Sequence, residues 1–198
     1  MPSDENDWDS YYSHIEGRKV RPLLLQVLAA FPEDAAPGTA IDLGCGDGTE
    51  TAHLLRRGWR VLAVDAEPRA IERLGAKVPP EALQRLRTQV AFFHAVDWIP
   101  ADLVHASLSL PFCPPERFTA VWEGLTASLK PGGRFAGEFF GVRDGYAGTA
   151  DMTFLSADQA RALFDGFEVE SFHELEEDGE STDGPKHWHI ITVIARKA

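Results

Sequence analysis

The sequence predicts a single-domain α/β protein over residues 1–198, with a central sheet of parallel strands. Strand and helix patterns alternate twice between residues 40 and 74, and parallel strands need such helical crossovers. The length of 198 residues suits one domain, because a single core keeps growing up to about 250–300 residues. The sequence contains no 18-residue apolar run, so no transmembrane helix is expected.

The first 21 residues are predicted to form a lid segment, ahead of an α/β core over residues 22–198. The segment has an acidic start, an aromatic run that includes Tyr11, and two arginines, Arg18 and Arg21. In this interpretation the segment covers a ligand site, and one of the arginines binds a carboxylate or another anionic group of the substrate. The alternative is a frayed tail whose aromatic side chains cover core surface.

The first half of the core contains two strands between three helices. The expected elements are a helix from Pro22, a strand over 40–43, a helix over 49–57, a strand over 60–65 and a helix from Pro68. Proline suits the first turn of a helix, and apolar residues from Leu23 to Phe31 recur at helical spacing. The second helix ends at Gly58 after two arginines, which is a typical C-terminal signal.

The second half of the chain is expected to contribute five strands and two helices. These are strands over 90–94, 101–107, 134–140, 168–175 and 187–196, and helices from Pro115 and from Ser156. Residues 79–89 are ambiguous and fit a short extra helix. Ser156 and Gln159 form a capping-box pattern. The last two strands are expected to pair as an antiparallel hairpin around an acidic loop, residues 176–186, and the final strand is apolar enough to be covered on both faces.

The stretch from Ala40 to Gly48 carries the most informative motif. A strand runs into Gly44, Gly46 and Gly48, a spacing that suits a tight strand-to-helix turn where a ligand approaches the backbone. Adenosine cofactors are the usual ligands of such a turn, and dinucleotide enzymes use a related pattern with a third glycine or alanine.

Two acids and a threonine separate this turn from the dinucleotide pattern. Thr49 fills the third small position, and Asp42 and Asp47 flank the turn. Because a carboxylate repels a pyrophosphate, the turn suits a cofactor that carries positive charge. S-adenosylmethionine qualifies through its ammonium and sulfonium groups.

Asp65 supports an adenosine ligand independently. It ends a strand 21 positions after Gly44, which matches the roughly 20-residue spacing to an acid that accepts hydrogen bonds from ribose hydroxyls. A helix N-terminal acid is a compatible alternative role. Asp97 and Trp98 follow the third strand, so they are candidates for contact with the adenine, with a solvated loop as the alternative. The predicted cofactor-binding residues are Asp42, Gly44, Cys45, Gly46, Asp47, Gly48, Asp65, Ala66, Asp97, Trp98 and Ser107.

These motifs resemble those of a known family. Residues 41–48, Asp65 and the Lys-Pro-Gly-Gly run at 130–133 look like the successive motifs of class I S-adenosylmethionine-dependent methyltransferases. The resemblance covers about residues 40–140, and the tail over 154–197 is similar to the tellurite-resistance and thiopurine type of methyltransferase. It implies methyl transfer and a Rossmann-like seven-stranded sheet of order 3-2-1-4-5-7-6, with strand 7 antiparallel and helices on both faces.

Methyl transfer makes few demands on catalytic side chains, because the methyl group already sits on a cationic sulfur leaving group. We therefore assign no catalytic residue and expect a pocket wall at residues 107–112, after the fourth strand. This run departs from the Asn/Asp-Pro-Pro-Tyr segment of methyltransferases that act on exocyclic amines, and it favours a small or soft nucleophile. The substrate-pocket candidates are Tyr11, Arg18, Ser109, Pro111, Phe112, Arg143, His187 and His189.

Three of these candidates have open alternatives. His187 and His189 are two positions apart, so they share a strand face, which is compatible with proton transfer or metal binding. Polar residues at a strand end are the favoured interpretation, because no third ligand is identifiable, and no metal is predicted. Arg143 either holds an anionic substrate or lies on the surface.

Composition limits the partners. The formal net charge of −12 repels a phosphate backbone, so a small-molecule methyl acceptor is expected, and neither nucleic acid nor a membrane. Cys45 and Cys113 form no disulfide framework or zinc pair. The acidic N-terminus lacks a signal-peptide pattern, so a cytoplasmic location is expected. The expected assembly is a monomer or homodimer.

Two other functions stay open. One is aminopropyl transfer from decarboxylated S-adenosylmethionine, although the paired-aspartate amine site that it needs is not found after the fourth strand. The other is a cofactor-binding partner subunit without catalysis of its own.

Overall fold

The computed structural model describes residues 8, 11–13, 15–32, 34–182 and 184–198. Its strands are β1 (Thr39–Leu43), β2 (Arg60–Asp65), β3 (Leu86–Val90), β4 (Ala101–Ala106), β5 (Leu129–Gly141), β6 (Phe154–Leu155), β7 (Phe167–Ser181) and β8 (Gly184–Lys197). Within the described residues they form one eight-stranded sheet in the order β3-β2-β1-β4-β5-β8-β7, with β6 paired to β5. β1 to β5 are parallel, whereas β8 is antiparallel to both of its neighbours.

This topology confirms the expected order 3-2-1-4-5-7-6, because β8 and β7 take the places of predicted strands 7 and 6. The sheet has one strand more than the seven predicted. The extra strand, β6, consists of Phe154 and Leu155, which pair with the end of β5. Two residues are too few to leave an alternating pattern in the sequence.

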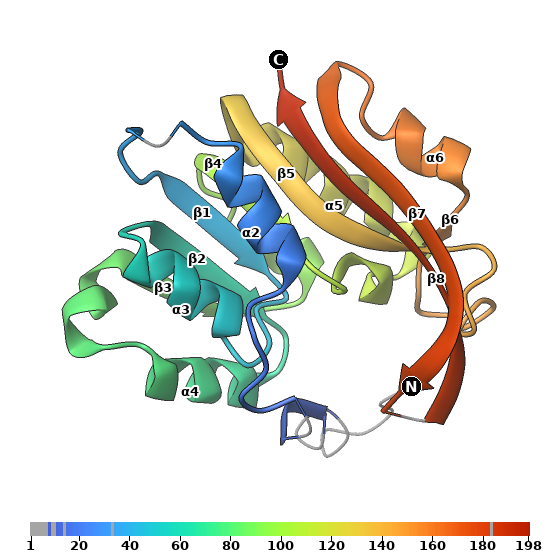
Figure 1. Ribbon diagram of the computed structural model, residues 1–198, viewed down its shortest axis with the longest axis horizontal. Coiled ribbons are helices and arrows are strands. Elements are labelled where there is room, and N and C mark those ends of the chain that lie inside the picture. The colour runs from blue at the N-terminus through green and yellow to red at the C-terminus, as the bar shows by residue number, and fades with distance from the viewer. Residues whose placement is uncertain (1–7, 9–10, 14, 33, 183) are drawn as a thin grey trace.

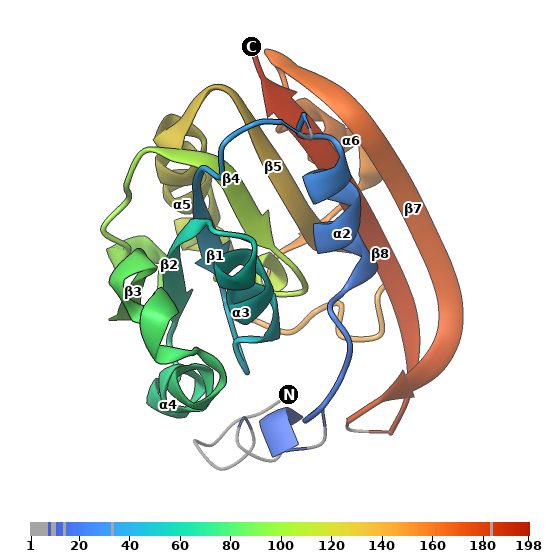
Figure 2. The ribbon, with the colours of Figure 1, turned by 60° about the vertical axis from the view of Figure 1, so that its left-hand side comes forward.

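Helices cover both faces of the sheet (Figures 1 and 2). They are α2 (Pro22–Ala29), α3 (Thr49–Arg56), α4 (Pro68–Lys77), α5 (Pro115–Ser128) and α6 (Ala157–Ala162), with short 3-10 helices η1 (Pro80–Arg85), η2 (Phe93–Ala95) and η3 (Leu110–Phe112). One buried cluster joins the sheet to α2, α3 and α4, and a second joins it to α5 and α6. Ser156 and Gln159 form the expected capping box at the start of α6.

The third strand was predicted four residues too late. The strand occupies Leu86–Val90, and the apolar residues after it leave the sheet and enter η2. β3 is an edge strand with a half-exposed, polar pattern, whereas Phe92 and Phe93 belong to the loop that follows. The prediction was placed too late because it followed the apolar residues, which come after the strand.

The predicted acidic loop over residues 176–186 is also wrong in large part, because most of it belongs to strands. β7 and β8 stay paired from Phe167 opposite Lys197 to Ser181 opposite Gly184. Cross-strand partners neutralise the acids, since the ring of His187 bonds to Glu176 and Asp178. The antiparallel hairpin itself is confirmed. β8 is covered on both faces as expected, with Val193 in one buried cluster and Ile194 in the other.

The carboxyl ends of the parallel strands meet at one edge of the sheet, and the N-terminal segment runs across that edge (Figures 1 and 2). In open α/β sheets, ligands bind outside the carboxyl ends of the strands. This edge is therefore where the candidate site is sought. No helix within the described ranges has the length and apolar character needed to cross a lipid bilayer.

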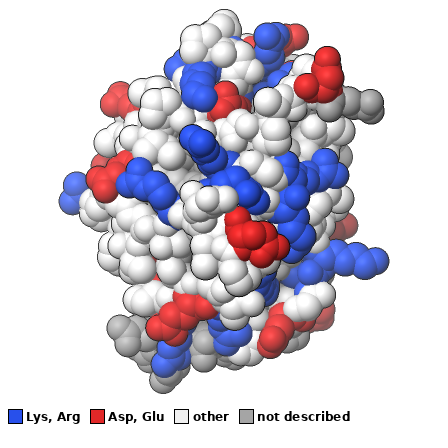
Figure 3. Space-filling model, turned by 90° about the vertical axis from the view of Figure 1, so that its left-hand side faces the viewer, with Lys and Arg blue, Asp and Glu red and all other residues white. Residues whose placement is uncertain are grey.

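The charge of the chain is unevenly distributed. Eight of its 19 Lys and Arg residues fall within residues 56–87, against four of its 31 Asp and Glu residues. Figure 3 shows Lys and Arg side chains gathered on the side of the molecule that carries α4 and β3. Because one face is basic despite the net negative charge, the absence of a nucleic-acid partner stays a prediction.

Candidate functional site

The glycine turn after β1 requires backbone conformations that favour glycine. Gly44, Gly46 and Gly48 have φ angles of 74°, 52° and 76°, in the left-handed region that glycine enters without steric cost. The amides of Gly44 and Cys45 both donate to the carbonyl oxygen of Val64, at 2.8 and 2.9 Å. The turn is therefore fixed to the end of β2, as a strand-to-helix turn that leads into α3.

Asp65 lies beside this turn at the end of β2, where the sequence placed it. Its Oδ2 accepts a hydrogen bond from the amide of Gly46 at 2.8 Å, and its Oδ1 accepts one from the amide of Glu67 at 3.0 Å. The side chain is buried, and burial raises the pKa of Asp65 despite these two donors. The neighbouring predicted residue, Ala66, is exposed.

Asp42 lies beneath the turn and is fully engaged by protein groups. Its Oδ2 accepts from the hydroxyl of Thr51 at 2.5 Å, and its Oδ1 lies 2.9 Å from Nδ1 of His105. All three side chains are buried. Both oxygens of the Asp42 carboxylate are therefore occupied by protein side chains, and Asp42 supports the strand ends.

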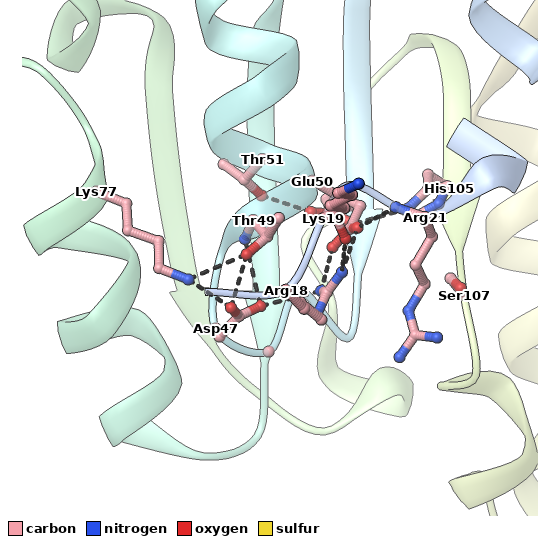
Figure 4. Close-up of polar contacts among 12 residues, drawn as sticks. Arg18, Lys19, Arg21, Asp47, Thr49, Glu50, Thr51, Lys77, His105 and Ser107 are labelled. Carbon is pink, nitrogen blue, oxygen red and sulfur yellow. Dashed lines mark hydrogen bonds and ion pairs between the residues drawn. The ribbon is translucent and has the colours of Figure 1, made fainter. Parts of the chain in front are cut away.

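Asp47 and Glu50 attach the lid segment to the turn (Figure 4). Arg18 forms ion pairs with both carboxylates, and Lys77 pairs with Asp47 from the other side. Burial alone raises the pKa of Asp47, but hydrogen bonds from Lys77 and Thr49 and the charge of Arg18 outweigh it, so that pKa lies below its ordinary value. Arg18, predicted to bind an anionic substrate, instead has its guanidinium occupied by two carboxylates.

The same network is expected to make lid attachment sensitive to acid. Burial opposes ionisation of Glu50, yet the hydrogen bond and charge of Arg18 lower its pKa, as Asp47 is lowered. Two carboxylates with lowered pKa values in the folded protein stabilise it at any pH above their ordinary pKa values of 3.8 and 4.5. This stabilisation is lost as the pH falls through the lowered pKa values of the folded state. Urea unfolding at pH 7 and pH 3 should therefore show a smaller acid-induced loss in Arg18→Gln than in the wild type.

Lys19→Gln is the matched control for this experiment, because Lys19 is exposed in the same segment. It should keep the wild-type pH dependence. Identical acid-induced losses in Arg18→Gln and the wild type would contradict the assignment.

Aromatic residues of the lid segment pack over the turn. Tyr12, which the sequence analysis did not single out, is buried, and a Cβ on Gly46 would lie 3.3 Å from its ring. Burial and the charge of Asp65 raise the pKa of the Tyr12 phenol. Trp8 and the half-buried Tyr11 contact Tyr12 through their rings. Residues 1–7, 9–10 and 14 of the predicted lid lie outside the described residues.

Asp97 and Trp98 are not brought to the turn. Asp97 is exposed, and the indole of Trp98 occupies the space where a Cβ on Gly124 of α5 would lie. Phe93 is nearer, since its ring lies 3.6 Å from the Cβ position of Gly44. The misplaced third strand accounts for this difference, because the strand ends at residue 90 and residues 91–93 follow it directly.

The residues of the predicted pocket wall after β4, residues 107–112, have different roles. The Ser109 hydroxyl donates to the carbonyl oxygen of Leu43 at 2.6 Å, and Pro111 is buried, so both hold the wall in place. The half-buried Phe112 meets the ring of Trp8 at 5.3 Å. The Ser107 hydroxyl donates to Glu138 at 2.6 Å, and Glu138 is a further polar group of this edge that the sequence did not reveal.

A family model described as a methyltransferase domain matches residues 40–133. This part of the chain is therefore similar to a methyltransferase domain. The matched range contains the glycine turn, Asp65, and the wall after β4.

Curated relatives agree with this assignment. The chain is 35% identical over 103 residues to an uncharacterized methyltransferase of Synechocystis, covering 51% of this chain and 47% of that protein. It is 32% identical over 136 residues to a trans-aconitate 2-methyltransferase of Methylobacterium radiotolerans, covering 66% and 48%. The chain thus spans about half the length of the curated relatives it matches.

Solved structures share the fold of this methyltransferase domain. TehB from Haemophilus influenzae superimposes with a TM-score of 0.77 at 16% identity, covering 96% of this chain and 67% of that chain. A Burkholderia thailandensis 1,6-didemethyltoxoflavin-N1-methyltransferase, solved with S-adenosylhomocysteine, gives 0.65 at 21% identity and covers 98% and 87%. These likenesses establish a methyltransferase fold.

The remaining candidates, Arg143 in the loop after β5 and the two histidines on β8, lie beyond the matched residues 40–133. Arg143 bonds to Glu174 and Glu176 on the surface. His189 is buried, and its Nε2 lies 2.7 Å from Glu174. A hydrogen bond to Asp178, with a second to Glu176, raises the pKa of His187. Both histidines thus face one row of carboxylates, as expected for one strand face. Among the described residues, no group of three or more His, Cys, Asp or Glu side chains is placed to hold a metal ion.

A buried ion pair joins the loop after β5 to β8. Nζ of Lys186 lies 2.8 Å from Oδ1 of Asp144, and neither side chain is more than 3% exposed. Nζ also lies 4.2, 4.0 and 3.4 Å from the ring centroids of Phe140, Tyr146 and Trp188. Burial lowers the pKa of Lys186, against the opposing effect of Asp144. The pair fixes the outer wall of the strand-end edge.

Proposed function

We propose that this chain binds S-adenosylmethionine at the glycine turn and Asp65, and transfers its methyl group to a small molecule. The observation that carries the proposal is the Asp65 carboxylate, held by the amides of Gly46 and Glu67. It lies beside a turn where added Cβ atoms would meet the side chains of Ser109, Tyr12 and Leu74. This geometry suits a ribose diol on the carboxylate and a methionine chain along the turn.

The charges of the site fit a cationic cofactor. Asp47 and Glu50 are neutralised by Arg18 and Lys77, whereas no ion pair to Asp65 is found among the described residues. Asp65 therefore retains an acceptor for ribose hydroxyls. Phe93, beside the turn, offers an apolar face for the adenine.

The chain's own residues would position the reactants and exclude water. When bound, the cofactor supplies a methyl group on a cationic sulfur, which an in-line nucleophile displaces. Tyr12 and Trp8 of the lid segment, with Phe112 after β4, form an aromatic cover at this edge. Such a cover lowers the local polarity and keeps water from competing with the acceptor.

A small-molecule acceptor is supported by the net charge of −12 and by the named acceptors of relatives. One curated relative is a trans-aconitate 2-methyltransferase, and one structural neighbour is a didemethyltoxoflavin N1-methyltransferase. The predicted cytoplasmic location and the monomeric or homodimeric state stay predictions, as does the role of residues 1–21 as a lid.

The Asp65→Ala variant tests the cofactor site. Titration calorimetry with S-adenosylhomocysteine should show binding weakened by about 1.5–3 kcal/mol, because a charged hydrogen-bond acceptor is lost. Asp97→Ala is the matched control and should bind as the wild type does, since Asp97 is exposed and away from the turn. Unchanged affinity in a folded Asp65→Ala protein would contradict the ribose assignment.

A product screen with labelled methyl donor tests catalysis. Thiols, metalloid oxyanions, small amines and carboxylates are the acceptor classes to compare. Labelled product in one class supports methyl transfer, whereas tight cofactor binding without product in any class supports a non-catalytic partner subunit.

A further inference from the structure

His105 on β4 carries a buried nitrogen that the protein leaves without a hydrogen-bond partner. Within the described residues, four side-chain nitrogens are buried and unpartnered: Arg18 Nε, His53 Nε2, Arg85 Nε and His105 Nε2. Only His105 among them is wholly buried, at 1% exposure. Buried polar atoms are usually satisfied, and an exception at a ligand-binding edge points to a group supplied by a ligand.

The surroundings fix the orientation of the imidazole. β4 lies between β1 and β5, so His105 is flanked by Asp42 on one side and Ala136 on the other. Nδ1 donates to the Asp42 carboxylate at 2.9 Å, and Asp42 is itself held by the Thr51 hydroxyl at 2.5 Å. When the ring is neutral, its only proton is therefore on Nδ1, and Nε2 presents a lone pair.

Ionisable groups lie on the elements around His105. Asp42 of β1 bonds to Nδ1, Glu50 of α3 accepts from the amide of Arg21 just before α2, and Glu138 of β5 bonds to Ser107. Figure 4 shows His105 beside Arg21, with Ser107 further toward the strand end. Ser107 is two residues on, so it shares the face of β4 with His105.

We propose that His105, oriented by Asp42, is the general base that accepts the proton of a weakly acidic hydroxyl or thiol on the methyl acceptor. As the acceptor's O–H or S–H bond breaks, its proton passes to Nε2 and its electron pair attacks the methyl carbon. The carbon–sulfur bond of the cofactor breaks, and the sulfonium becomes a neutral thioether. The positive charge of the cofactor thus ends on the imidazolium, beside the Asp42 carboxylate.

This inference rests on the proposed function and names its acceptor class. A base oriented by a buried carboxylate, which a third group holds in turn, is the usual arrangement for activating an O–H or S–H nucleophile. Nδ1 alone bonds to the Asp42 carboxylate, so a purely structural role leaves Nε2 unexplained. The lid residues Arg18 and Arg21 bond to Glu50 beside His105, so entry of an acceptor requires that segment to move.

The kinetic test uses aromatic thiols and phenols of graded acidity as probe acceptors. For probes that are protonated at the assay pH, His105→Gln should lower kcat/KM by about 10²–10⁴-fold, as expected for loss of a general base. For probes that are already ionised the loss should be less than about tenfold. The acidic limb of the wild-type pH profile should disappear in the variant. His173→Gln, an exposed histidine on β7, should behave as the wild type.

An equal loss with protonated and ionised probes, or no loss, would overturn the proposal. Affinity for S-adenosylhomocysteine separates failure of the proposed function from failure of the proposed base. Wild-type protein that does not bind S-adenosylhomocysteine contradicts the proposed function and leaves the role of His105 to the other measurements. If no probe is methylated, nitrogen-15 NMR of labelled histidine in the S-adenosylhomocysteine complex decides. A bare Nε2 and protonated Nδ1 support the base, and a protonated Nε2 with a bare Nδ1 overturns it.

Discussion

Asp144→Ala is expected to lower the free energy of unfolding by about 3–5 kcal/mol, because it leaves the buried Lys186 ammonium without its counter-charge. The three aromatic rings around Nζ attract the cation, but cation–π contacts are weaker than a lost buried ion pair. Urea unfolding at pH 7 measures the loss.

Two control variants sharpen this result. Glu168→Ala removes the partner of Arg196 from a pair at 3.4 Å that is 48% and 68% exposed, so its cost should stay below about 1 kcal/mol. Asp144→Ala combined with Lys186→Met should recover much of the loss, since no buried charge remains. A single-variant loss as small as that of Glu168→Ala would show that the ammonium is solvated.

Gly44→Ala should disable the glycine turn, with a stability loss of about 2–5 kcal/mol and no measurable binding of S-adenosylhomocysteine. Gly44 has a φ of 74°, where a side chain costs about 1–2 kcal/mol. A Cβ there would also overlap the Cβ of Ser109, and overpacking adds about 1–3 kcal/mol. Unfolding curves and titration calorimetry measure the two effects.

Gly166→Ala separates strain from overlap. Gly166 has a φ of 83°, and a Cβ there would meet nothing within 4 Å. Its replacement should cost only the conformational part, about 1–2 kcal/mol, with cofactor affinity unchanged. Equal losses in the two variants would contradict the proposed overlap with Ser109.

The central strands and the turn were predictable because their signals are local. β1, β2 and β4 are mostly apolar, as buried parallel strands are. The positive φ angles at Gly44, Gly46 and Gly48 are ones that glycine adopts readily. β3 was misplaced because an edge strand buries little, so its polar pattern could not compete with the apolar loop after it. The strand pairing of the acidic residues 176–181 was not predicted, because their partners lie on the neighbouring strand β8.

Side-chain partners at the site depended on tertiary structure. Sequence spacing placed Asp65 correctly, since one βαβ unit fixes it relative to the turn. Sequence spacing could not show that Asp42 faces His105, 63 positions away. Nor could it show that the carboxylates of Glu50 and Asp47 bind the guanidinium of Arg18. Tyr12 and Phe93 became visible as site residues only once the lid segment and the true end of β3 were in place.

The buried pair of Lys186 and Asp144 has a consequence for where substitutions act. The turn and Asp65 are built from β1, β2 and α3, whereas the pair and its aromatic rings belong to the later part of the chain, beyond the matched range that ends at residue 133. Each part is held by its own contacts. Substitutions in the ion pair and its aromatic rings therefore fall on elements other than those that form the turn.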